Sequence, residues 1–398
     1  MVKREEYFNK LLKYKDKKLI KVITGIRRCG KSTLLKMFRD YLIDNAVDEK
    51  QIIFINFENL ANEDLTNYKS LYNYLNDEIT SNKMYYIMLD EIQNVADFQK
   101  VIDSIYLKDN VDIYITGSNA YMLSSEIATL IAGRYLQIEM LPLSYKEYIE
   151  GIEKEPNTDI FLSYLQNGSF PQILQFNEDT ELITDYVENL FNTIVVKDIL
   201  SRKKINDVFI LKSILSFIID NIGSTVSTKR IADVLSSTGR KVDYKTVEKY
   251  LGAMLESYIL YQIKRYDIKG KQYLKSQEKY YVADVSFKNM LMPNKRLEMG
   301  HVLENIVYLE LIRRGYKVYI GKANEYEIDF VATKGSEKEY IQVASTISDT
   351  EVYNREIRPL KIIKDNYDKI LLTMDKVFDN NDDGIIVMNV ENWLLRKH

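Results

Sequence analysis

The sequence predicts an α/β chain that begins with a parallel sheet built around a phosphate-binding loop. Gly25 to Ser32, GIRRCGKS, matches the pattern G-x-x-x-x-G-K-[ST] at every fixed position. The preceding residues, Leu19 to Thr24, form an apolar run of strand length, and apolar residues after Ser32 recur at the spacing of a helix. In a strand, loop and helix of this kind, the loop N–H groups and the helix N-terminus point at one spot, which favours a polyphosphate there.

The loop supplies the first predicted site residues. We expect Lys31 to reach the β- and γ-phosphates of ATP and the Ser32 hydroxyl to hold Mg²⁺. Cys29 would be a reactive thiol if it were partly exposed, because the basic residues around it create an electropositive setting. The predicted nucleotide-binding residues are Gly25, Ile26, Arg27, Arg28, Cys29, Gly30, Lys31, Ser32, Thr33 and Asp90.

Two further strands follow, and the second one ends in a pair of acids. Gln51 to Phe57 is predicted to be one strand and Met84 to Leu89 a buried one, directly before Asp90 and Glu91. An aspartate at this end of a strand can hold the water shell of Mg²⁺, and the glutamate beside it can polarise the attacking water. The alternative is an acidic turn after a strand, which is common.

Two more strands bring further polar residues. Val111 to Thr116 is the fourth predicted strand, and Ser118 or Asn119 after it is placed to touch the γ-phosphate or the water, unless the segment is an ordinary turn. Arg134 precedes the fifth strand, Tyr135 to Met140. Its guanidinium could act in a neighbouring subunit of a homo-oligomer, or it could be a surface arginine. The predicted catalytic residues are Glu91, Lys31, Asn119 and Arg134.

The order GIRRCGKS, YYIMLDE, YITGSN and AGRYLQIEMLPLSYKEY resembles AAA+-type P-loop ATPases of bacteria and archaea, in particular a group with a carboxyl-terminal domain of the restriction-endonuclease type. The resemblance implies that another strand separates the acidic strand from the phosphate-loop strand. It also implies four parts: an ATPase core at residues 1–145, a helical lid at 146–204, a winged helix at 205–290 and a nuclease-like domain at 296–398. The turn at Gly168 to Pro171 matches a lid turn in this group, although a plain helix break is the safer interpretation.

The middle of the chain has the pattern of a winged helix. Helices are predicted at Phe209–Ile219, Thr228–Leu235 and Lys245–Leu260, followed by a hairpin with a basic tip. Lys229 to Lys279 holds 12 basic and 6 acidic residues, a net charge of +6. The interpretation is that this region binds double-stranded DNA, and the alternative is a solvated face on a protein-binding module. The predicted DNA contacts are Lys245, Lys249, Lys269 and Lys271.

The carboxyl-terminal residues predict an α-β-β-β-α-β order that resembles the core of restriction-endonuclease-like nucleases. Such enzymes need an acid on the first helix, an acid on the second strand and Glu-x-Lys on the third, to hold Mg²⁺ and activate water. Glu304 and Asp329 occupy the first two positions, but the third position has Gln342 and Ala344. We therefore expect a degenerate nuclease site that is retained for binding or assembly.

Composition excludes several classes of protein. The 398 residues carry a net charge of −3, and no stretch approaches the roughly 20 apolar residues of a membrane span, so we expect a cytoplasmic protein with no membrane partner. One cysteine and two histidines exclude a disulfide framework and a zinc cluster. The sequence thus predicts an ATPase that uses ATP and Mg²⁺ and acts on DNA or a DNA-bound partner. The alternatives are a nucleotide-dependent scaffold without turnover and an ATP-regulated nuclease, which Gln342 and Ala344 oppose.

Overall fold

A computed structural model describes residues 2–120, 133–200, 205, 207–237, 239, 241–268, 270, 272–292, 298–376 and 380–396. The chain forms two compact units, one of Met1–Pro142 with Glu256–Tyr258 and one of Leu143–Leu255 with Ile259–His398. Of the described helices, none is both long enough and apolar enough to cross a membrane.

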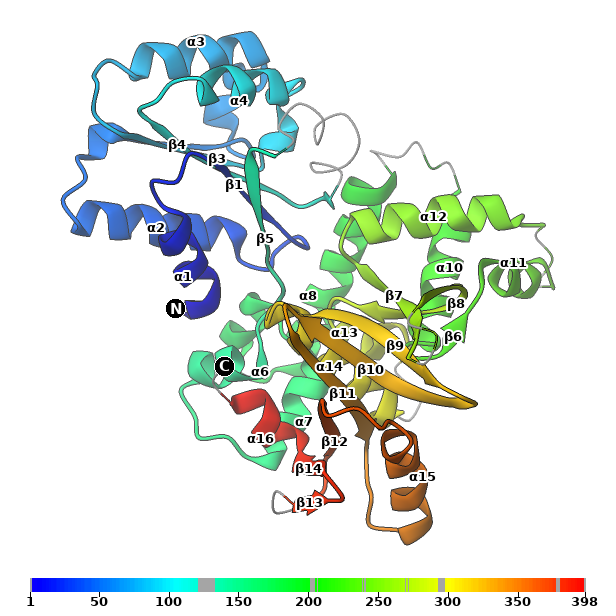
Figure 1. Ribbon diagram of the computed structural model, residues 1–398. Helices are drawn as coiled ribbons and strands as arrows, with labels where there is room; N and C mark the ends of the chain where they lie inside the picture. The colour runs from blue at the N-terminus through cyan, green and yellow to red at the C-terminus, as the bar shows by residue number, and fades with distance from the viewer. Residues whose placement is uncertain are drawn as a thin grey trace. The chain divides into compact units, whose positions relative to one another are not determined.

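The first unit contains a parallel sheet of five strands in the order β2-β3-β4-β1-β5 (Figure 1). The strands are β1 (Ile20–Thr24), β2 (Ile52–Asn56), β3 (Tyr85–Asp90), β4 (Val111–Gly117) and β5 (Tyr135–Glu139). All five coincide with predicted strands. Strand β4 separates the acidic strand β3 from the phosphate-loop strand β1, as the resemblance implied, so the predicted P-loop fold class is confirmed.

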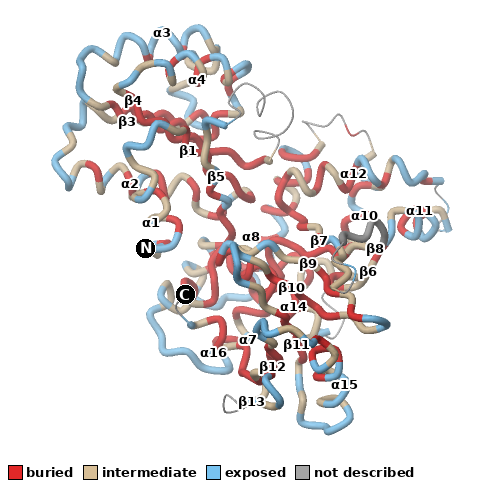
Figure 2. Tube along the Cα trace, in the orientation of Figure 1, coloured by how far each residue is buried: buried red, intermediate tan, exposed pale blue. Residues whose placement is uncertain are grey.

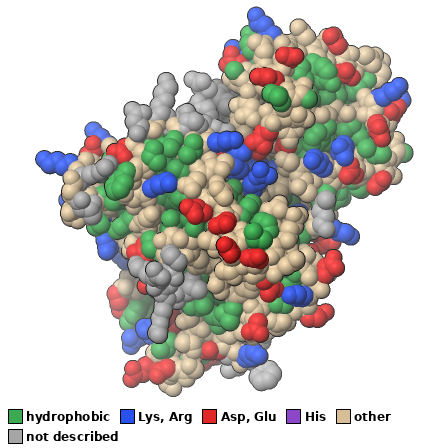
Figure 3. Space-filling model, turned by 180° about the vertical axis from the view of Figure 1, so that it is seen from behind, with side chains coloured by type: hydrophobic (Ala, Val, Ile, Leu, Met, Phe, Trp, Pro, Cys, Tyr) green, Lys and Arg blue, Asp and Glu red, His purple; other side chains and the backbone are tan. Residues whose placement is uncertain are grey.

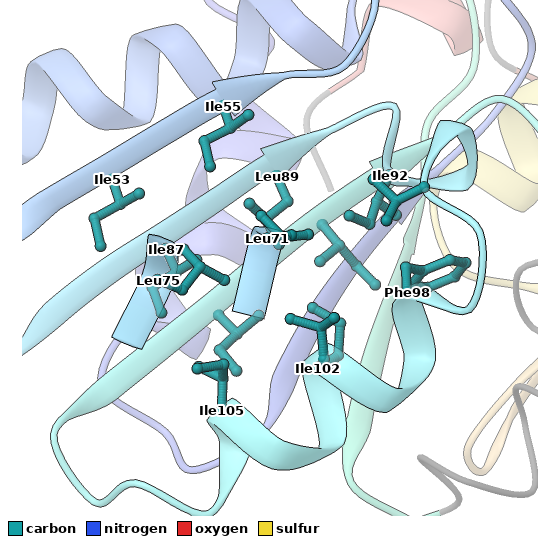
Figure 4. Close-up of a cluster of buried hydrophobic side chains, with 14 of the residues drawn as sticks. Ile53, Ile55, Leu71, Leu75, Ile87, Leu89, Ile92, Phe98, Ile102 and Ile105 are labelled. Atoms are coloured by element: carbon teal, nitrogen blue, oxygen red, sulfur yellow. The ribbon is translucent and has the colours of Figure 1, made fainter. Parts of the chain in front are cut away.

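Helices cover both faces of this sheet, which explains why β1, β3 and β4 are buried along their whole length (Figures 1 and 2). Helices α3 (Tyr68–Glu78) and α4 (Phe98–Tyr106) cover one face, where Leu71, Ile102 and Ile105 pack on strand residues such as Ile87 and Leu89 (Figure 4). Helices α1 (Glu5–Tyr14) and α2 (Lys31–Asp44) cover the other. Short 3₁₀ segments lie at Glu49–Gln51, Leu60–Thr66 and Ile92–Asn94.

The second unit begins with helices and continues into a mixed α/β region. The predicted helical segment contains α6 (Tyr145–Ile152), α7 (Thr158–Asn167), a 3₁₀ turn (Pro171–Phe176), α8 (Thr180–Thr193) and a π-helical stretch (Ile194–Leu200). The three helices predicted next are α10 (Val208–Asp220), α11 (Thr228–Ser237) and α12 (Tyr244–Glu256), with α13 (Ser286–Leu291) further on. The predicted hairpin consists of β7 (Leu260–Asp267) and β8 (Gln272–Val282), and β8 also pairs with β6 (Thr225–Val226).

The hairpin is not a separate wing, because β7 pairs in parallel with β9 and joins a nine-stranded sheet in the order β13-β14-β12-β11-β10-β9-β7-β8-β6. The rest of this sheet comes from the carboxyl-terminal residues. Their elements are α14 (Met299–Arg313), β9 (Lys317–Ala323), β10 (Tyr326–Lys334), β11 (Glu337–Ala344), α15 (Thr350–Lys361), β12 (Asp368–Thr373), β13 (Asn380–Asp382), β14 (Ile385–Asn389) and α16 (Val390–Leu395). The predicted α-β-β-β-α-β order is therefore present, with β9, β10 and β11 antiparallel and β12 parallel to β11.

Candidate functional site

The phosphate loop connects the carboxyl end of β1 to the first turn of α2. Gly25 has a φ of 143° and Gly30 a φ of 107°, values that side chains rarely tolerate. A Cβ atom on Gly25 would lie 2.0 Å from the carbonyl oxygen of Met140, so only glycine allows this close approach. Gly30 is the N-cap of α2, and no side chain in the described part of the chain caps that end. The first N–H groups of α2 are thus directed toward the concave side of the loop.

Lys31 lies against the loop and reaches the acidic pair. Its Nζ donates to the carbonyl oxygens of Gly25 at 3.0 Å and Ile26 at 3.2 Å, and lies 3.6 Å from Glu91 Oε1. Lys31 is 3% exposed, so its charge acts in a poorly solvated environment where it interacts strongly with a neighbouring carboxylate. The two motifs recognised in the sequence therefore meet at the carboxyl edge of the sheet.

Asp90, at the end of β3, is buried, and both of its carboxylate oxygens accept hydrogen bonds. Thr116 Oγ1 donates to Asp90 Oδ1 at 2.6 Å, and Asn56 Nδ2 donates to Asp90 Oδ2 at 2.8 Å. Burial raises the pKa of Asp90, while hydrogen bonds from the Thr116 and Ser32 hydroxyl groups counteract part of this rise. The contact with Ser32 places the two predicted Mg²⁺ ligands beside each other.

Glu91 has the opposite electrostatic character. Burial alone would raise the pKa of its carboxyl, but the charge of Lys31 and a hydrogen bond from Gln93 bring the pKa below its ordinary value. Its backbone has a φ of 55°, and its N–H donates to Thr116 Oγ1 at 2.8 Å. Ser118 also forms a hydrogen bond with the Glu91 carboxylate. Glu91 is thus an ionised, oriented carboxylate at the mouth of the loop, which is the state that a general base requires.

Other predicted residues of the first unit take up different positions. Asn119 is 2% exposed just after β4, at the same edge as Glu91. Arg28 is exposed, and Arg27 Nη1 lies 2.7 Å from Glu58 Oε1. Arg134 lies at the amino ends of β1 and β5, where its carbonyl accepts from Ile20 N at 2.8 Å and its side chain pairs with Asp103 at 2.7 Å. Because the phosphate loop follows the carboxyl end of β1, Arg134 does not contact the site of its own chain.

The sequence did not identify two residues that hold this site together. Arg4 Nη1 donates to Cys29 O at 2.8 Å and Arg4 Nη2 to Leu141 O at 2.6 Å, so the amino-terminal segment supports the loop backbone. Thr116 forms hydrogen bonds with both Asp90 and the backbone of Glu91, but in the sequence it was only the last residue of the predicted fourth strand.

The expected partial exposure of Cys29 is wrong: the side chain is fully buried, and burial raises the pKa of the thiol. Cys29 is a buried residue of the loop itself.

The predicted DNA-contacting residues are only partly described. Lys245 and Lys249 are exposed on α12, together with exposed Lys229 and Arg230 on α11, whereas Lys269 and Lys271 lie outside the described residues. Lys279, which contributed to the charge of +6, is 3% exposed and does not belong to a surface. On the face shown in Figure 3, basic and acidic side chains are interspersed, in agreement with the small net charge.

The carboxyl-terminal candidates gather around one point. Asp329 N donates to Gln342 Oε1 at 3.3 Å, and Asp329 Oδ2 accepts from Val343 N at 2.9 Å. Glu304 lies nearby, since Lys279 Nζ is 3.3 Å from Glu304 Oε2 and 3.7 Å from Asp329 Oδ1. Ala344 instead belongs to the apolar cluster that packs on α15. The structure thus places Glu304, Asp329 and Gln342 near one another, and it adds Lys279, which the sequence analysis did not identify.

Two regions of this chain match known protein families, and nearly the whole chain matches relatives. Residues 17–149 match a family model described as an AAA domain, and residues 158–298 match a domain of unknown function, DUF8612. An uncharacterized protein of Haemophilus influenzae is 37% identical over 401 residues, covering 100% of this chain and 99% of that protein. The uncharacterized protein MJ1544 of Methanocaldococcus jannaschii is 30% identical, covering 94% of this chain and 85% of that protein.

A solved structure supports the fold. The Walker-type ATPase PABY2304 of Pyrococcus abyssi superposes with a TM-score of 0.52 at 15% identity, covering 73% of this chain and 96% of that one. At this identity the similarity concerns the fold alone.

Proposed function

This chain belongs to the same family as its uncharacterized relatives from Haemophilus influenzae and Methanocaldococcus jannaschii, and its residues 17–149 match an AAA domain; we propose that it binds and hydrolyses ATP in order to act on DNA or on a DNA-bound partner. The observation that carries this proposal is the meeting of Lys31 and Glu91, 3.6 Å apart, at the mouth of a glycine-dependent loop. Lys31 contacts the transferring phosphoryl group in this proposal, and Glu91 orients and deprotonates the attacking water.

The residues at the loop are compatible with a magnesium ion. Ser32 and Asp90, which form a hydrogen bond with each other, offer the hydroxyl and carboxylate oxygens that Mg²⁺ prefers. The ion would neutralise charge on the β- and γ-phosphates when bound. Asn56 and Thr116 orient Asp90 from behind, so its carboxylate is fixed before any ligand arrives.

The DNA part of the proposal rests on the second unit. Three helices and a hairpin follow one another in the order of a winged helix, and the exposed lysines Lys245 and Lys249 lie on the third helix. In this proposal α12 approaches a groove and the tip with Lys269 and Lys271 approaches a phosphate backbone. In this proposal the carboxyl-terminal segment serves binding or assembly, and Arg134 completes the site of a neighbouring copy.

A phosphate-release assay with purified protein, with and without duplex DNA, tests the proposal. We expect steady turnover by the parental protein. Lys31→Ala should lose nucleotide binding, and Glu91→Gln should keep binding but lose turnover, because an amide cannot take a proton from water. Lys36→Ala, an exposed lysine on the same helix α2, is the matched control and should behave like the parent.

The pattern of the two variants separates the alternatives. Parental turnover in Glu91→Gln would show that the assigned base is wrong. Tight ATP binding by the parental protein without phosphate release, with or without DNA, would instead identify a nucleotide-dependent scaffold.

A further inference from the structure

The carboxylates of the carboxyl-terminal segment surround a lysine from another part of the chain. Lys279 Nζ, on β8, lies 2.9 Å from Glu327 Oε1, 3.3 Å from Glu304 Oε2 and 3.7 Å from Asp329 Oδ1. These carboxylates come from α14 and β10. Lys279 is 3% exposed, so its amine has these carboxylates, and not water, as partners. One buried cation is therefore shared by three acids.

The residues present do not suit the divalent cation that a nuclease-like fold implies. Mg²⁺ needs several oxygen ligands at about 2.1 Å, whereas here the oxygens of Glu304, Glu327 and Asp329 surround the ammonium group of Lys279. Asp329 Oδ2 is already occupied by Val343 N at 2.9 Å. Across the described ranges, no three His, Cys, Asp or Glu side chains are arranged to hold a metal ion.

Two further side chains and a turn of the backbone lie against these carboxylates. Tyr281 donates its hydroxyl to Glu304 Oε2 at 3.0 Å, and Arg265 Nη2 lies 4.0 Å from Glu327 Oε2. A Cβ atom on Gly223 would lie 3.0 Å from Glu304 Oε2, so the turn after α10 lies directly against that carboxylate. The groups that approach Glu304 thus come from elements distant in sequence.

We propose that the ammonium group of Lys279 takes the place of a metal ion in this cluster. It balances the carboxylates of Glu304, Glu327 and Asp329 and fastens the β7–β8 hairpin to the carboxyl-terminal segment. Removing the amine frees the carboxylate oxygens that now contact it, and we expect these oxygens to rearrange around a divalent cation. This inference does not depend on nucleotide hydrolysis.

The test measures Mn²⁺ binding to the nucleotide-free full chain by the electron paramagnetic resonance signal of free Mn²⁺. The parental protein and Lys264→Met, an exposed lysine on neighbouring β7, should show no binding that depends on Asp329. Lys279→Met should gain one saturable site, lose it on addition of Asp329→Asn, and gain several degrees of thermal stability with Mn²⁺. Lys279→Gln keeps two N–H donors for the carboxylates and serves if the methionine variant does not fold.

Two results would overturn the proposal. One is a folded Lys279→Met or Lys279→Gln protein that takes up no Mn²⁺. The other is Mn²⁺ binding by the parental protein that disappears in Asp329→Asn, because a metal would then coexist with Lys279. The second measurement needs no lysine variant, so it decides even if both variants fail to fold.

Discussion

Thr116 is the residue on which the geometry of both acids depends. Its hydroxyl donates to Asp90 Oδ1 and accepts from the backbone N–H of Glu91, whose φ of 55° requires support. Thr116→Val keeps the shape but removes both hydrogen bonds. We expect turnover to fall by roughly tenfold to a hundredfold, since a lost hydrogen bond to a charged group is worth about 1.5–3 kcal/mol.

The nucleotide affinity of Thr116→Val should change much less, because Lys31 and the loop are untouched. Thr116→Ser keeps the hydroxyl and is the control. Parental phosphate release by Thr116→Val, measured at saturating ATP, would mean that Asp90 and Glu91 keep their geometry without this hydroxyl.

Single residues were predictable where chemistry follows from a local motif. Lys31, Ser32, Asp90 and Glu91 stand in short patterns at the ends of predicted strands, and the resemblance, not the spacing, implied how those strands are arranged. Arg4 and Lys279 were not predictable, because each acts on residues more than twenty positions away through the tertiary fold. The partial exposure expected for Cys29 was wrong for the same reason. Basic neighbours in the sequence do not reveal that the folded chain buries the thiol.

Among the elements, the turn after α7 is fixed by Asp284, a carboxylate that is 1% exposed and follows β8. Asp284 Oδ2 accepts from the N–H and hydroxyl of Ser169, at 2.7 and 2.6 Å, and Oδ1 accepts from Ser286 N at 2.9 Å. Gly168 has a φ of 82°, and a Cβ atom there would lie 2.0 Å from Asp284 Oδ1. The turn that the sequence suggested was a plain helix break is thus a specific hydrogen-bonded connection.

Asp284→Ala leaves several buried donors without an acceptor, so we expect a loss of roughly 2–4 kcal/mol in the free energy of unfolding. Urea unfolding followed by circular dichroism measures it. Asp284→Asn keeps one acceptor oxygen and should lose less, and Asp233→Ala, an exposed carboxylate on α11, should lose almost nothing. Equal stability of Asp284→Ala and the parent would show that the serine donors find other partners.

Element types and order were predictable from apolar periodicity, but some ends were not. The prediction extended the third helix of the second unit to Leu260, whereas α12 ends at Glu256 and Tyr258 adopts a φ of 60°. A tyrosine does not favour a positive φ by itself, so contacts within the folded chain must stabilise this conformation. Strand β6 has two residues, too few to produce a periodic signal.

At the scale of the whole molecule, Arg134 acts in phosphate release only if copies of the chain assemble. It lies at the amino edge of the sheet, about 16 Å along β1 from the phosphate loop at 3.3 Å per residue. We expect a mixture of Arg134→Ala and Lys31→Ala proteins to recover part of the phosphate release that neither shows alone. Asp103→Ala, which removes the partner of Arg134, should remain active. No recovery in a mixture proven to co-assemble would make Arg134 a structural residue.

The nine-stranded sheet was the least predictable feature, because it joins segments that composition and motifs assign to different domains. The pairing of Arg265 with Ile320 makes the predicted hairpin part of the carboxyl-terminal sheet. The pairing of strands that lie far apart in the chain produces no local pattern in the sequence. Each strand was therefore predictable, but the order in which the strands pair in the sheet was not. The domain boundaries near residues 290–296 and 204–205 stay predictions.

The last prediction concerns DNA and follows from the local charge of +6 and from Lys245 and Lys249, which are exposed on α12. Contacts with phosphates release counterions, so log K should fall with log salt by roughly 0.9 for each phosphate neutralised. Removing Lys269 and Lys271 together should weaken binding to every duplex and flatten that slope by up to about two units. Lys245 and Lys249 lie on a helix, so their loss should also relax any sequence preference if they touch base edges.

Fluorescence anisotropy with labelled duplexes at several salt concentrations measures both affinity and slope. Lys50→Ala/Lys83→Ala removes two exposed lysines of the first unit and should leave both unchanged. ATP hydrolysis without DNA should stay at the parental rate in every one of these variants, because none of the substituted lysines belongs to the phosphate loop or to the acidic pair. A Lys269→Ala/Lys271→Ala protein that keeps both its affinity and its salt slope, or a parental protein that binds no duplex at low salt, would favour a protein partner. The basic residues of this region would then form an ordinary solvated surface, and the ATPase would act through another segment of the second unit.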